Sequence, residues 1–292
     1  MRSRTDRVLV TGAAGLLGRA VLAALAGRPV TALDRADPGD LPADRVVTGD
    51  AGDPAVVRAA LEGVGAVVHL AAIPAPTLDT PLRVFGGNTR ATFVVLHEAA
   101  LAGVRHVVLA SSMSVLGLAW AQVPLRPLYL PVDVRHPLQV SDPYALSKQA
   151  DEATAAMVAR RHGIAVTALR FPFLGGDERL ARRSAEFAAD PGSGALELWT
   201  YLHTADAAEA CLRALTVPPP GAHVLFVAAD ETLAPYPTED LLAKFLPDVP
   251  LRARFPGRAV PVALEPARRL LGFTAAHPLP LSSRPLDEEE PA

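Results

Sequence analysis

Apolar and polar residues alternate in a regular pattern over the first 170 residues of the chain. Short runs rich in β-branched residues, which predict strands, are separated by longer stretches rich in Ala and Leu, which predict helices. The predicted strands are residues 7–11, 29–34, 45–48, 66–70, 106–110 and 165–170, and the predicted helices are residues 15–27, 54–62, 89–103 and 143–162. Strands and helices alternating at this spacing are typical of a doubly wound parallel sheet, so we expect an α/β fold.

The pattern breaks at residues 174–200, which contain two adjacent glycines and three arginines, Arg179, Arg182 and Arg183. We interpret this segment as an inserted lid or substrate loop. The elements expected after it are a loop entering a helix at residues 201–215, one more strand at 222–228, and short helices at 238–245 and 265–271 in a Pro-rich region. The acidic residues 287–292 are expected to be disordered.

Composition narrows the classes of partner. The chain has 292 residues, half of them hydrophobic, and a formal net charge of −3. It has no dense block of Lys and Arg, which argues against nucleic acid or an anionic membrane and favours a small-molecule partner. The polar N-terminus and the lack of a long apolar run predict neither a signal peptide nor a membrane span. The single cysteine, Cys211, is expected in a helix core, and its lack of a disulfide partner favours the cytoplasm.

A glycine-rich turn follows the first predicted strand and opens the first predicted helix. Its glycines are Gly12, Gly15 and Gly18, with GxxGxxG spacing in place of the more usual GxGxxG. Glycines permit a tight turn and a close approach of the backbone to a pyrophosphate, and the helix N-terminus offers N–H groups to the anion. The turn therefore predicts a dinucleotide site and, together with the strand pattern, a Rossmann-type fold.

Acidic residues stand after the next two predicted strands. Asp34 lies 22 residues beyond Gly12, where a carboxylate can accept hydrogen bonds from the adenosine ribose and repel a 2′-phosphate. This favours NAD over NADP, although the adjacent Arg35 argues the other way. Asp50 follows the third strand, where it either meets the adenine amino group or serves as a turn or cap residue.

A tyrosine and a lysine four residues apart give the best indication of the chemistry. Tyr144 and Lys148 lie in a predicted helix that begins at Pro143, so both side chains lie on one face. A phenol ionises near pH ~10 and needs nearby positive charge to accept a proton at neutral pH. Lys148, one of two lysines in the chain, can supply part of that charge. The simpler alternative is a solvated pair on a helix surface.

These motifs, with His69–Ala72 and Ser111–Ser112, occur in an order that resembles the extended short-chain dehydrogenase/reductase superfamily, specifically its NAD-dependent epimerase/dehydratase family. The resemblance covers residues 7–215 and continues more weakly to about residue 278. It implies a catalytic set of Ser112, Tyr144 and Lys148. In residues 110–117 Leu116 replaces the family's usual tyrosine.

The resemblance and the strand ends together give the expected site. The expected NAD-binding residues are Gly12, Ala14, Gly15, Leu16, Leu17, Gly18, Asp34, Arg35, Asp50, Ala51, Leu70, Ala71, Ala72, Tyr144, Lys148, Phe171 and Phe173. The expected substrate residues are Asn88, Ser112, Met113 and Arg179. Asn88 matches a family asparagine that holds local geometry or contacts substrate, and its alternative role is an N-cap for residues 89–103.

The expected reaction is the transfer of a hydride between NAD and a substrate carbon, with Tyr144 moving the hydroxyl proton and Ser112 steadying the oxygen. The family's sugar dehydratases carry an Asp-Glu pair after the catalytic Ser or Thr. Met113 and Ser114 stand there instead, which argues against dehydration. The family's nucleotide-sugar enzymes insert a long segment after the sixth strand, whereas only about 30 residues separate Arg170 from Tyr201. By this resemblance we expect a free sugar, a sugar acid or another hydroxy compound, and hence a dehydrogenase or reductase. The alternatives are a nucleotide-sugar epimerase and a non-catalytic dinucleotide-sensing protein.

The expected organisation is an NAD-binding Rossmann domain at residues 1–173, to which residues 201–228 return, and a small C-terminal substrate-binding lobe formed by residues 174–200 and 229–292. The resemblance also implies a homodimer through the helices at 89–103 and 143–162. The histidines lack paired spacing, so we expect no metal. Of these, His136 and His203 could line the cleft, but a structural role is expected for each.

Overall fold

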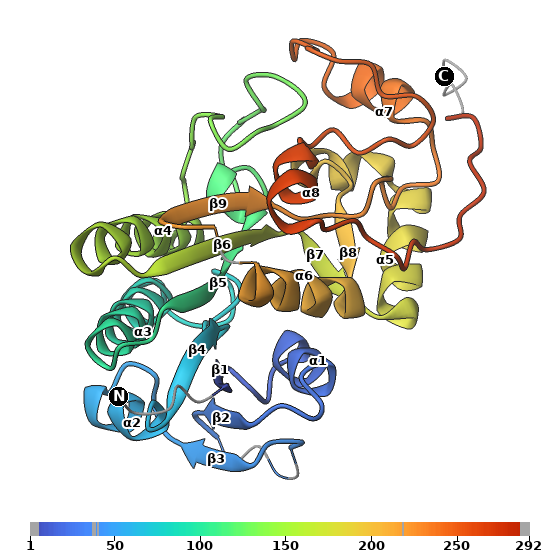
Figure 1. Ribbon diagram of the computed structural model, residues 1–292. Helices are drawn as coiled ribbons and strands as arrows, with labels where there is room; N and C mark the ends of the chain where they lie inside the picture. The colour runs from blue at the N-terminus through green and yellow to red at the C-terminus, as the bar shows by residue number, and fades with distance from the viewer. Residues whose placement is uncertain (1–5, 37–38, 40, 218, 287–292) are drawn as a thin grey trace.

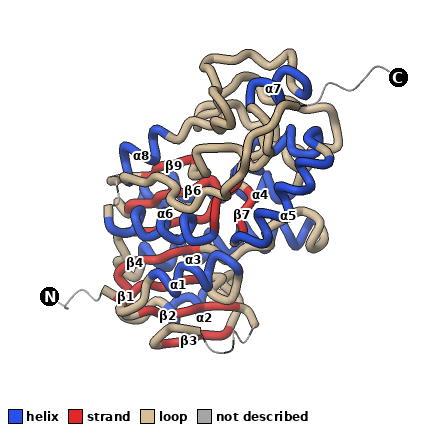
Figure 2. Tube along the Cα trace, turned by 90° about the vertical axis from the view of Figure 1, so that its right-hand side faces the viewer, coloured by secondary structure: helices blue, strands red, loops and turns tan. Residues whose placement is uncertain are grey.

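A seven-stranded parallel sheet forms the centre of the molecule (Figures 1 and 2), with strand order β3-β2-β1-β4-β5-β6-β9. The computed structural model describes residues 6–36, 39, 41–217 and 219–286. The strands are β1 (Arg7–Thr11), β2 (Val30–Asp34), β3 (Arg45–Thr48), β4 (Val64–His69), β5 (His106–Ser112), β6 (Ala165–Phe171) and β9 (Ala222–Phe226). This topology confirms the predicted Rossmann-type α/β fold.

Helices cover both faces of the sheet, which is why its central strands are continuous apolar runs. In β1, Val8, Leu9 and Val10 are all fully buried. The helices α1 (Leu16–Ala24) and α6 (Thr204–Thr216) pack on one face, and α2 (Pro54–Ala60), α3 (Pro81–Leu101) and α4 (Pro143–His162) on the other (Figure 1). Cys211 lies in the buried face of α6, as expected, and burial raises the pKa of its thiol to about 12.

Helix α3 begins eight residues before its predicted start. Its N-cap is Thr80, whose hydroxyl accepts a hydrogen bond from the Arg83 N–H, and Pro81 occupies the first helical position. The adjacent Gly86 and Gly87, poor helix formers, hide this first part of the helix from sequence reasoning. Asn88 is therefore an interior helix residue, and its interpretation as an N-cap is wrong.

Residues 174–200 consist mainly of helix, so the prediction of an inserted loop is wrong. The segment consists of β7 (Phe173–Gly175), α5 (Asp177–Ala189) and the 3-10 helix η2 (Pro191–Glu197), and leads into β8 (Tyr201–His203). In α5 only Leu180, Ser184 and Phe187 are buried, at a helical spacing, among charged neighbours. The three arginines thus project from a helix, and β7 pairs with β8 in a separate two-stranded sheet.

A second hydrophobic cluster lies beside the sheet, around α5, α7 (Thr238–Phe245) and the neighbouring loops. Trp199 and Phe187 are among its largest fully buried side chains. Residues of the 113–132 region, such as Leu130, also contribute to it. The helices α7 and α8 (Glu265–Leu271) match their predicted bounds. The division of the chain into two lobes stays a prediction, and residues 287–292 lie outside the described part.

The segment after α8 returns along α6 and is held by two residues. The buried Asp206 carboxylate accepts hydrogen bonds from the N–H groups of Ala276 (3.0 Å) and His277 (2.9 Å), and His277 Nδ1 lies 2.7 Å from it. The Tyr201 hydroxyl accepts a hydrogen bond from the Leu279 N–H at 2.9 Å. The Tyr201–Asp206 motif therefore fastens the C-terminal segment.

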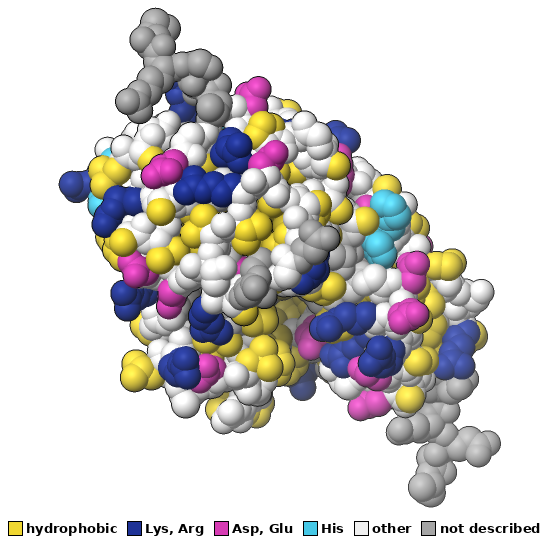
Figure 3. Space-filling view, turned by 90° about the horizontal axis from the view of Figure 1, so that it is seen from below, with side chains coloured by type: hydrophobic (Ala, Val, Ile, Leu, Met, Phe, Trp, Pro, Cys, Tyr) yellow, Lys and Arg dark blue, Asp and Glu magenta, His cyan; other side chains and the backbone are white. Residues whose placement is uncertain are grey.

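Charges of both signs lie side by side on the face drawn in Figure 3, with apolar patches between them. Of the helices in the described part of the chain, none has the length and apolar character that a bilayer crossing requires.

Candidate active site

One cleft of about 930 Å³ opens at the carboxyl ends of the strands. It lies where the strand order reverses about β1, which is the usual ligand site of an open parallel sheet. Every residue predicted for NAD, substrate or catalysis lines this cleft. They are Gly12, Ala14, Gly15, Leu16, Leu17, Gly18, Asp34, Arg35, Asp50, Ala51, Leu70, Ala71, Ala72, Asn88, Ser112, Met113, Tyr144, Lys148, Phe171, Phe173 and Arg179.

The glycine turn is closed so tightly that side chains are excluded from it. Gly12 has φ of 67°, and a Cβ there would lie 2.7 Å from the Ala71 backbone nitrogen. A Cβ on Gly18 would lie 2.2 Å from the Gly12 carbonyl oxygen. Gly15 is the N-cap of α1 and provides no side-chain cap, so the first N–H groups of this helix remain for an anion. The turn therefore fits the pyrophosphate of a dinucleotide.

Carboxylates stand at the ends of β2 and β3. Asp34 accepts hydrogen bonds from the N–H groups of Ala14 (2.9 Å) and Arg35 (2.7 Å), which fixes it beside the glycine turn. Asp50 accepts one from the Gly52 N–H at 2.7 Å and also lines the cleft. Asp50 is therefore a turn residue that lines the cleft, and its contact with the adenine amino group stays a prediction. The cap of α2 is Asp53.

The tyrosine and lysine lie at the start of α4, within the cleft wall. The Asp142 carboxylate caps this helix by accepting from the Tyr144 and Ala145 N–H groups, both at 2.9 Å. The Lys148 Nζ donates to the Ala110 carbonyl at 2.9 Å and to the Asp151 carboxylate at 3.2 Å, and lies 5.8 Å from the centre of the Tyr144 ring. Both side chains are buried, so the pair is not a solvated helix surface.

The charge of Lys148 is supported by its surroundings. Burial lowers the pKa of this ammonium, but the attraction of Asp151, then of Tyr144 and Glu152, outweighs burial and raises the pKa above its usual value. The raised pKa favours the charged form of Lys148 beside the phenol, which is the arrangement that proton transfer from a substrate hydroxyl requires.

The two serines at the end of β5 have different partners. The Ser111 hydroxyl donates to Glu152 at 2.6 Å, and the same carboxylate accepts from Arg170 through two hydrogen bonds of 2.8 Å. The Ser112 Oγ accepts from the Ser114 N–H at 3.0 Å, which leaves its own proton to donate. Of the two, Ser112 is the one able to bind an oxygen in the cleft.

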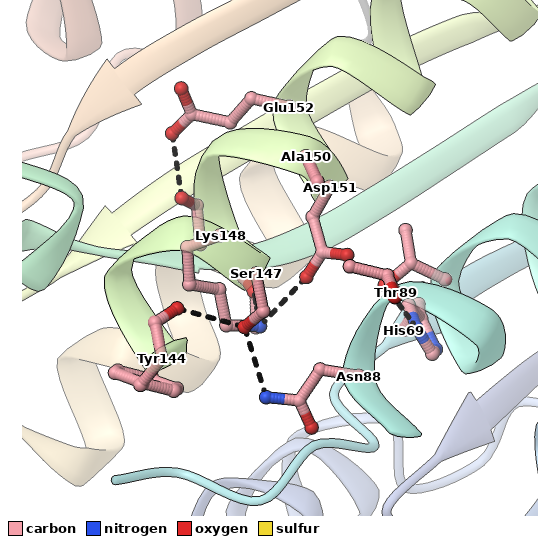
Figure 4. A network of polar contacts seen from close by, with 12 residues as sticks. His69, Asn88, Thr89, Tyr144, Ser147, Lys148, Ala150, Asp151 and Glu152 are labelled. Atoms are coloured by element: carbon pink, nitrogen blue, oxygen red, sulfur yellow. Dashed lines mark hydrogen bonds and ion pairs between the residues drawn. The ribbon is translucent and has the colours of Figure 1, made fainter. Parts of the chain in front are cut away.

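Asn88 joins three parts of the site. Its amide oxygen accepts from the Ile73 N–H at 2.8 Å, and its amide nitrogen donates to the Ile73 carbonyl at 3.1 Å. The amide nitrogen also donates to the Ser147 hydroxyl at 3.1 Å (Figure 4). Asn88 thereby fixes the loop after β4 against α4, and its substrate contact stays a prediction.

His69, at the end of β4, is buried between Thr11 and Thr92. Its Nδ1 lies 2.7 Å from the Thr11 hydroxyl and its Nε2 lies 3.2 Å from that of Thr92. Burial, and secondarily the charge of Lys148, lowers the pKa of His69 to about 3, so its ring is neutral.

An aromatic ring and a guanidinium stand at the opposite wall. The Arg179 guanidinium lies 4.7 Å from the centre of the Phe173 ring, and among the described residues no carboxylate pairs with it. Its neighbour Arg183, which also lines the cleft, is bound to Glu186 (2.8 Å) and Glu197 (3.1 Å).

Sequence reasoning missed several residues of this wall. Leu78 and Trp120 line the cleft from regions without a recognisable motif, and Glu197, Leu198 and Thr200 come from the segment mistaken for a loop. Leu198 and the next residue are left-handed, with φ of 55° and 51°, which is uncommon outside glycine. The sequence has no glycine or asparagine at these two positions that would predict the turn.

His136 and His203 are not among the cleft residues. His136 Nε2 accepts from the Leu128 N–H at 2.9 Å, and His203 Nδ1 accepts from the Ala205 N–H at 3.2 Å at the start of α6. Within the described ranges, no three His, Cys, Asp or Glu side chains are grouped as metal ligands would be.

The amino-acid sequence matches a known protein family. The sequence profile of the NAD dependent epimerase/dehydratase family matches residues 8–226, most of the chain. The chain belongs to this family of NAD-dependent enzymes. NAD is accordingly its cofactor, and the glycine turn and Asp34 would hold the pyrophosphate and the adenosine ribose.

Curated relatives are similar over little more than half of the chain. The uronate dehydrogenase of Pseudomonas putida is 28% identical over 56% of this chain and 60% of the relative. The L-arabinose 1-dehydrogenase (NAD(P)(+)) of Haloferax volcanii is 35% identical over 58% of this chain and 67% of the relative. A UDP-glucose 4-epimerase of Corynebacterium glutamicum is 29% identical over 56% and 50%.

Solved structures are similar over nearly the whole chain. A short-chain dehydrogenase/reductase superfamily protein from Agrobacterium tumefaciens with bound NAD is 28% identical, with a TM-score of 0.71 over 94% of this chain and 93% of that one. MoeE5, in complex with UDP-glucuronic acid and NAD, is 26% identical, with a TM-score of 0.69 over 94% and 95%.

The neutral state of His69 predicts a pH-dependent stability. An unfolded histidine takes up a proton below about pH 6.5, whereas folded His69 does so only near pH 3. Because the unfolded state binds more protons between these values, the free energy of unfolding falls as the pH falls, by up to about 5 kcal/mol. His69→Asn removes this contribution. Urea unfolding from pH 7 to pH 4 should give a shallower loss for the variant, and equal slopes would contradict the assignment.

Proposed function

We propose that the protein is an NAD-dependent dehydrogenase that oxidises a hydroxyl of a free sugar or sugar acid, by a mechanism in which Ser112, Tyr144 and Lys148 act together. The observation that carries the proposal is the joint presence, in one cleft, of the Tyr144–Lys148 pair and of the Arg179 guanidinium, which pairs with no carboxylate of the residues that the structure describes. Support comes from the similarity to uronate and arabinose dehydrogenases.

The residues divide the work as follows. NAD⁺, which the glycine turn and Asp34 would hold, would supply the hydride acceptor for the substrate carbon. Tyr144 takes the proton of the substrate hydroxyl, and the Lys148 ammonium favours the phenolate that does so. Ser112 donates its remaining proton to the substrate oxygen and steadies the charge that develops there. The Ala110 carbonyl holds the ammonium in place from the adjacent strand.

Arg179 favours a substrate with a negative group. A guanidinium presents a planar fork that binds a carboxylate through two parallel hydrogen bonds, and its stacking on Phe173 fixes the plane of that fork. The guanidinium of Arg183, in contrast, is already paired with the carboxylates of Glu186 and Glu197. A sugar acid is therefore the substrate class that this wall favours over a neutral sugar.

Epimerisation of a nucleotide sugar is the second candidate. It is favoured by the similarity to UDP-glucose 4-epimerases and to MoeE5, whose structure holds UDP-glucuronic acid. Dehydration remains disfavoured: Met113 is packed against Thr200, with its sulfur 3.4 Å from the hydroxyl, and Ser114 donates its N–H to Ser112. Neither side chain is an acid or a base.

A homodimer through α3 and α4 is part of the proposal. The two helices pack against each other, and their outer sides expose Phe93, Leu101 and Leu146, which a second copy would cover. We also propose a cytoplasmic location, because the one cysteine is a buried thiol, and the two-lobe division given above.

Tyr144→Phe removes the proton acceptor and leaves the dinucleotide site unchanged. We expect turnover of sugar acids with NAD⁺, followed as NADH formation, to fall by at least about 100-fold, while the dissociation constant of NAD⁺ stays within about twofold. Tyr236→Phe is the matched control, since that hydroxyl donates to the Ala188 carbonyl outside the cleft. Equal effects of wild-type and Tyr144→Phe protein on the cell, with no turnover by either, would favour the dinucleotide-sensing alternative.

Arg179→Ala tests the substrate class. The loss of a charge-assisted contact is expected to raise the KM for a uronic acid by about 10- to 100-fold and to leave that for the matching neutral aldose within about threefold. Arg182→Ala, on the same helix but outside the cleft lining, should change neither value. An unchanged KM for the acid in the Arg179 variant would remove the carboxylate from the proposal.

The state of the cofactor after purification separates the two reactions. A dehydrogenase must exchange its nicotinamide at every turnover, so the purified protein should release NAD on simple buffer exchange and show net NADH formation. Denaturation followed by chromatography of the released nucleotide measures what is retained. Stoichiometric NAD that survives buffer exchange, together with activity on a UDP-sugar without net redox, would favour the epimerase.

A further inference from the structure

The buried ammonium of Lys148 forms an ion pair with the buried carboxylate of Asp151. Lys148 and Asp151 are 4% and 1% exposed, and the ammonium lies 3.2 Å from the Asp151 Oδ2 (Figure 4). The two residues are three positions apart on α4, so the helix itself holds them together. The mechanism described above uses the lysine and leaves the aspartate without a role.

Other charged groups near the lysine are already compensated or neutral. Glu152, the next residue on α4, is bound by Arg170 of β6 through two hydrogen bonds. His69 of β4 is neutral because its pKa is lowered to about 3. Thr92 and Asn88 of α3 carry no charge, and from β5 the lysine receives only the Ala110 carbonyl. Asp151 is therefore the carboxylate that acts on Lys148 without a cation of its own.

The Asp151 carboxylate has few other contacts. Burial raises its pKa, and Lys148, followed by the Thr92 hydroxyl, opposes that rise. An ammonium has three protons to donate, and Ala110 and Asp151 occupy two of them. One proton of Lys148 is left for the cleft, which Tyr144 also lines and where the cofactor would bind.

We propose that Asp151 is a positioning residue for the dehydrogenase reaction: it holds the Lys148 ammonium and offsets part of its charge, and thereby sets the pH at which Tyr144 loses its proton. The inference rests on the proposed function of Tyr144 as the base. A buried carboxylate in contact with the ammonium weakens the field that the phenol experiences, because inside a protein such fields are only partly screened.

Asp151→Asn tests this by removing the charge and keeping a hydrogen-bond acceptor of the same size. With the full ammonium charge acting on it, Tyr144 should ionise on the order of one pH unit lower than in the wild type. The measurement is the phenolate absorbance during a pH titration with saturating NAD⁺, and the Tyr144→Phe version of each protein is subtracted to isolate this one phenol. The titration needs no substrate, so an absence of sugar dehydrogenase activity would not affect its outcome.

Asp248→Asn is the matched control for loss of a carboxylate. Its side chain is 86% exposed and pairs with Arg126 at the surface, where solvent and salt screen the charge, so the Tyr144 titration should not move. If turnover is found, the rising limb of kcat/KM with pH should shift in the same direction and by the same amount as the absorbance.

Asp151→Ser removes the same charge from a smaller side chain and replaces the Asn variant if that protein does not fold. A titration that stays at the wild-type pH in a folded variant, or moves to higher pH, overturns the proposal, since Asp151 would then carry no effective charge. Loss of the native fold in both variants also overturns it, because the pair would then serve folding and not the base.

Discussion

The close approach of Gly12 to the backbone of Leu70 and Ala71 is the constraint on which the cleft depends. It joins the first strand to the fourth at the point where the strand order reverses, and no side chain fits between them. The same turn brings Gly18 against the Gly12 carbonyl and so sets the start of α1. A dinucleotide can then reach the helix N-terminus from one side and the ends of β4 and β5 from the other.

The second constraint is a charge kept away from water. An ammonium in the protein interior is costly unless anions and dipoles replace its hydration. Here the Ala110 carbonyl and the Asp151 carboxylate replace part of it, and nearby Glu152 belongs to the Arg170 pair. The side of the cleft that carries Tyr144 and Lys148 is therefore a packed polar layer between α3, α4 and the sheet. Its neutral members, Asn88, Thr92 and His69, are as much a part of it as the charged ones.

The sequence predicted the sheet, and it predicted which residues of the glycine turn and of the strand ends line one cleft, because both follow from short-range rules. A parallel strand buried on both faces is a continuous apolar run, and the glycine turn and the Tyr144–Lys148 pair have fixed spacings. All of the predicted residues line the cleft. The start of α3 was missed because Gly86 and Gly87 disguise it.

The wall of the cleft that α5 and the turn at Leu198 form could not be predicted in the same way. Helix α5 buries three positions among many charges, and the left-handed turn at Leu198 depends on contacts with distant parts of the chain. Trp120 reaches the cleft from a stretch without regular structure. Asp151 is the most instructive case. Its spacing from Lys148 is visible in the sequence, but only the fold shows that both side chains are buried and that they form an ion pair.

The short strand β8 links the far end of the chain to the wall of the cleft. Thr200 lines the cleft. The next residue, Tyr201, accepts a hydrogen bond from the Leu279 N–H through its hydroxyl, and Asp206 accepts hydrogen bonds from the N–H groups of Ala276 and His277. None of the described residues beyond α8 borders the cleft itself. The position of Thr200 in the cleft wall is therefore tied, through β8 and the start of α6, to a segment of the chain that lies outside the cleft.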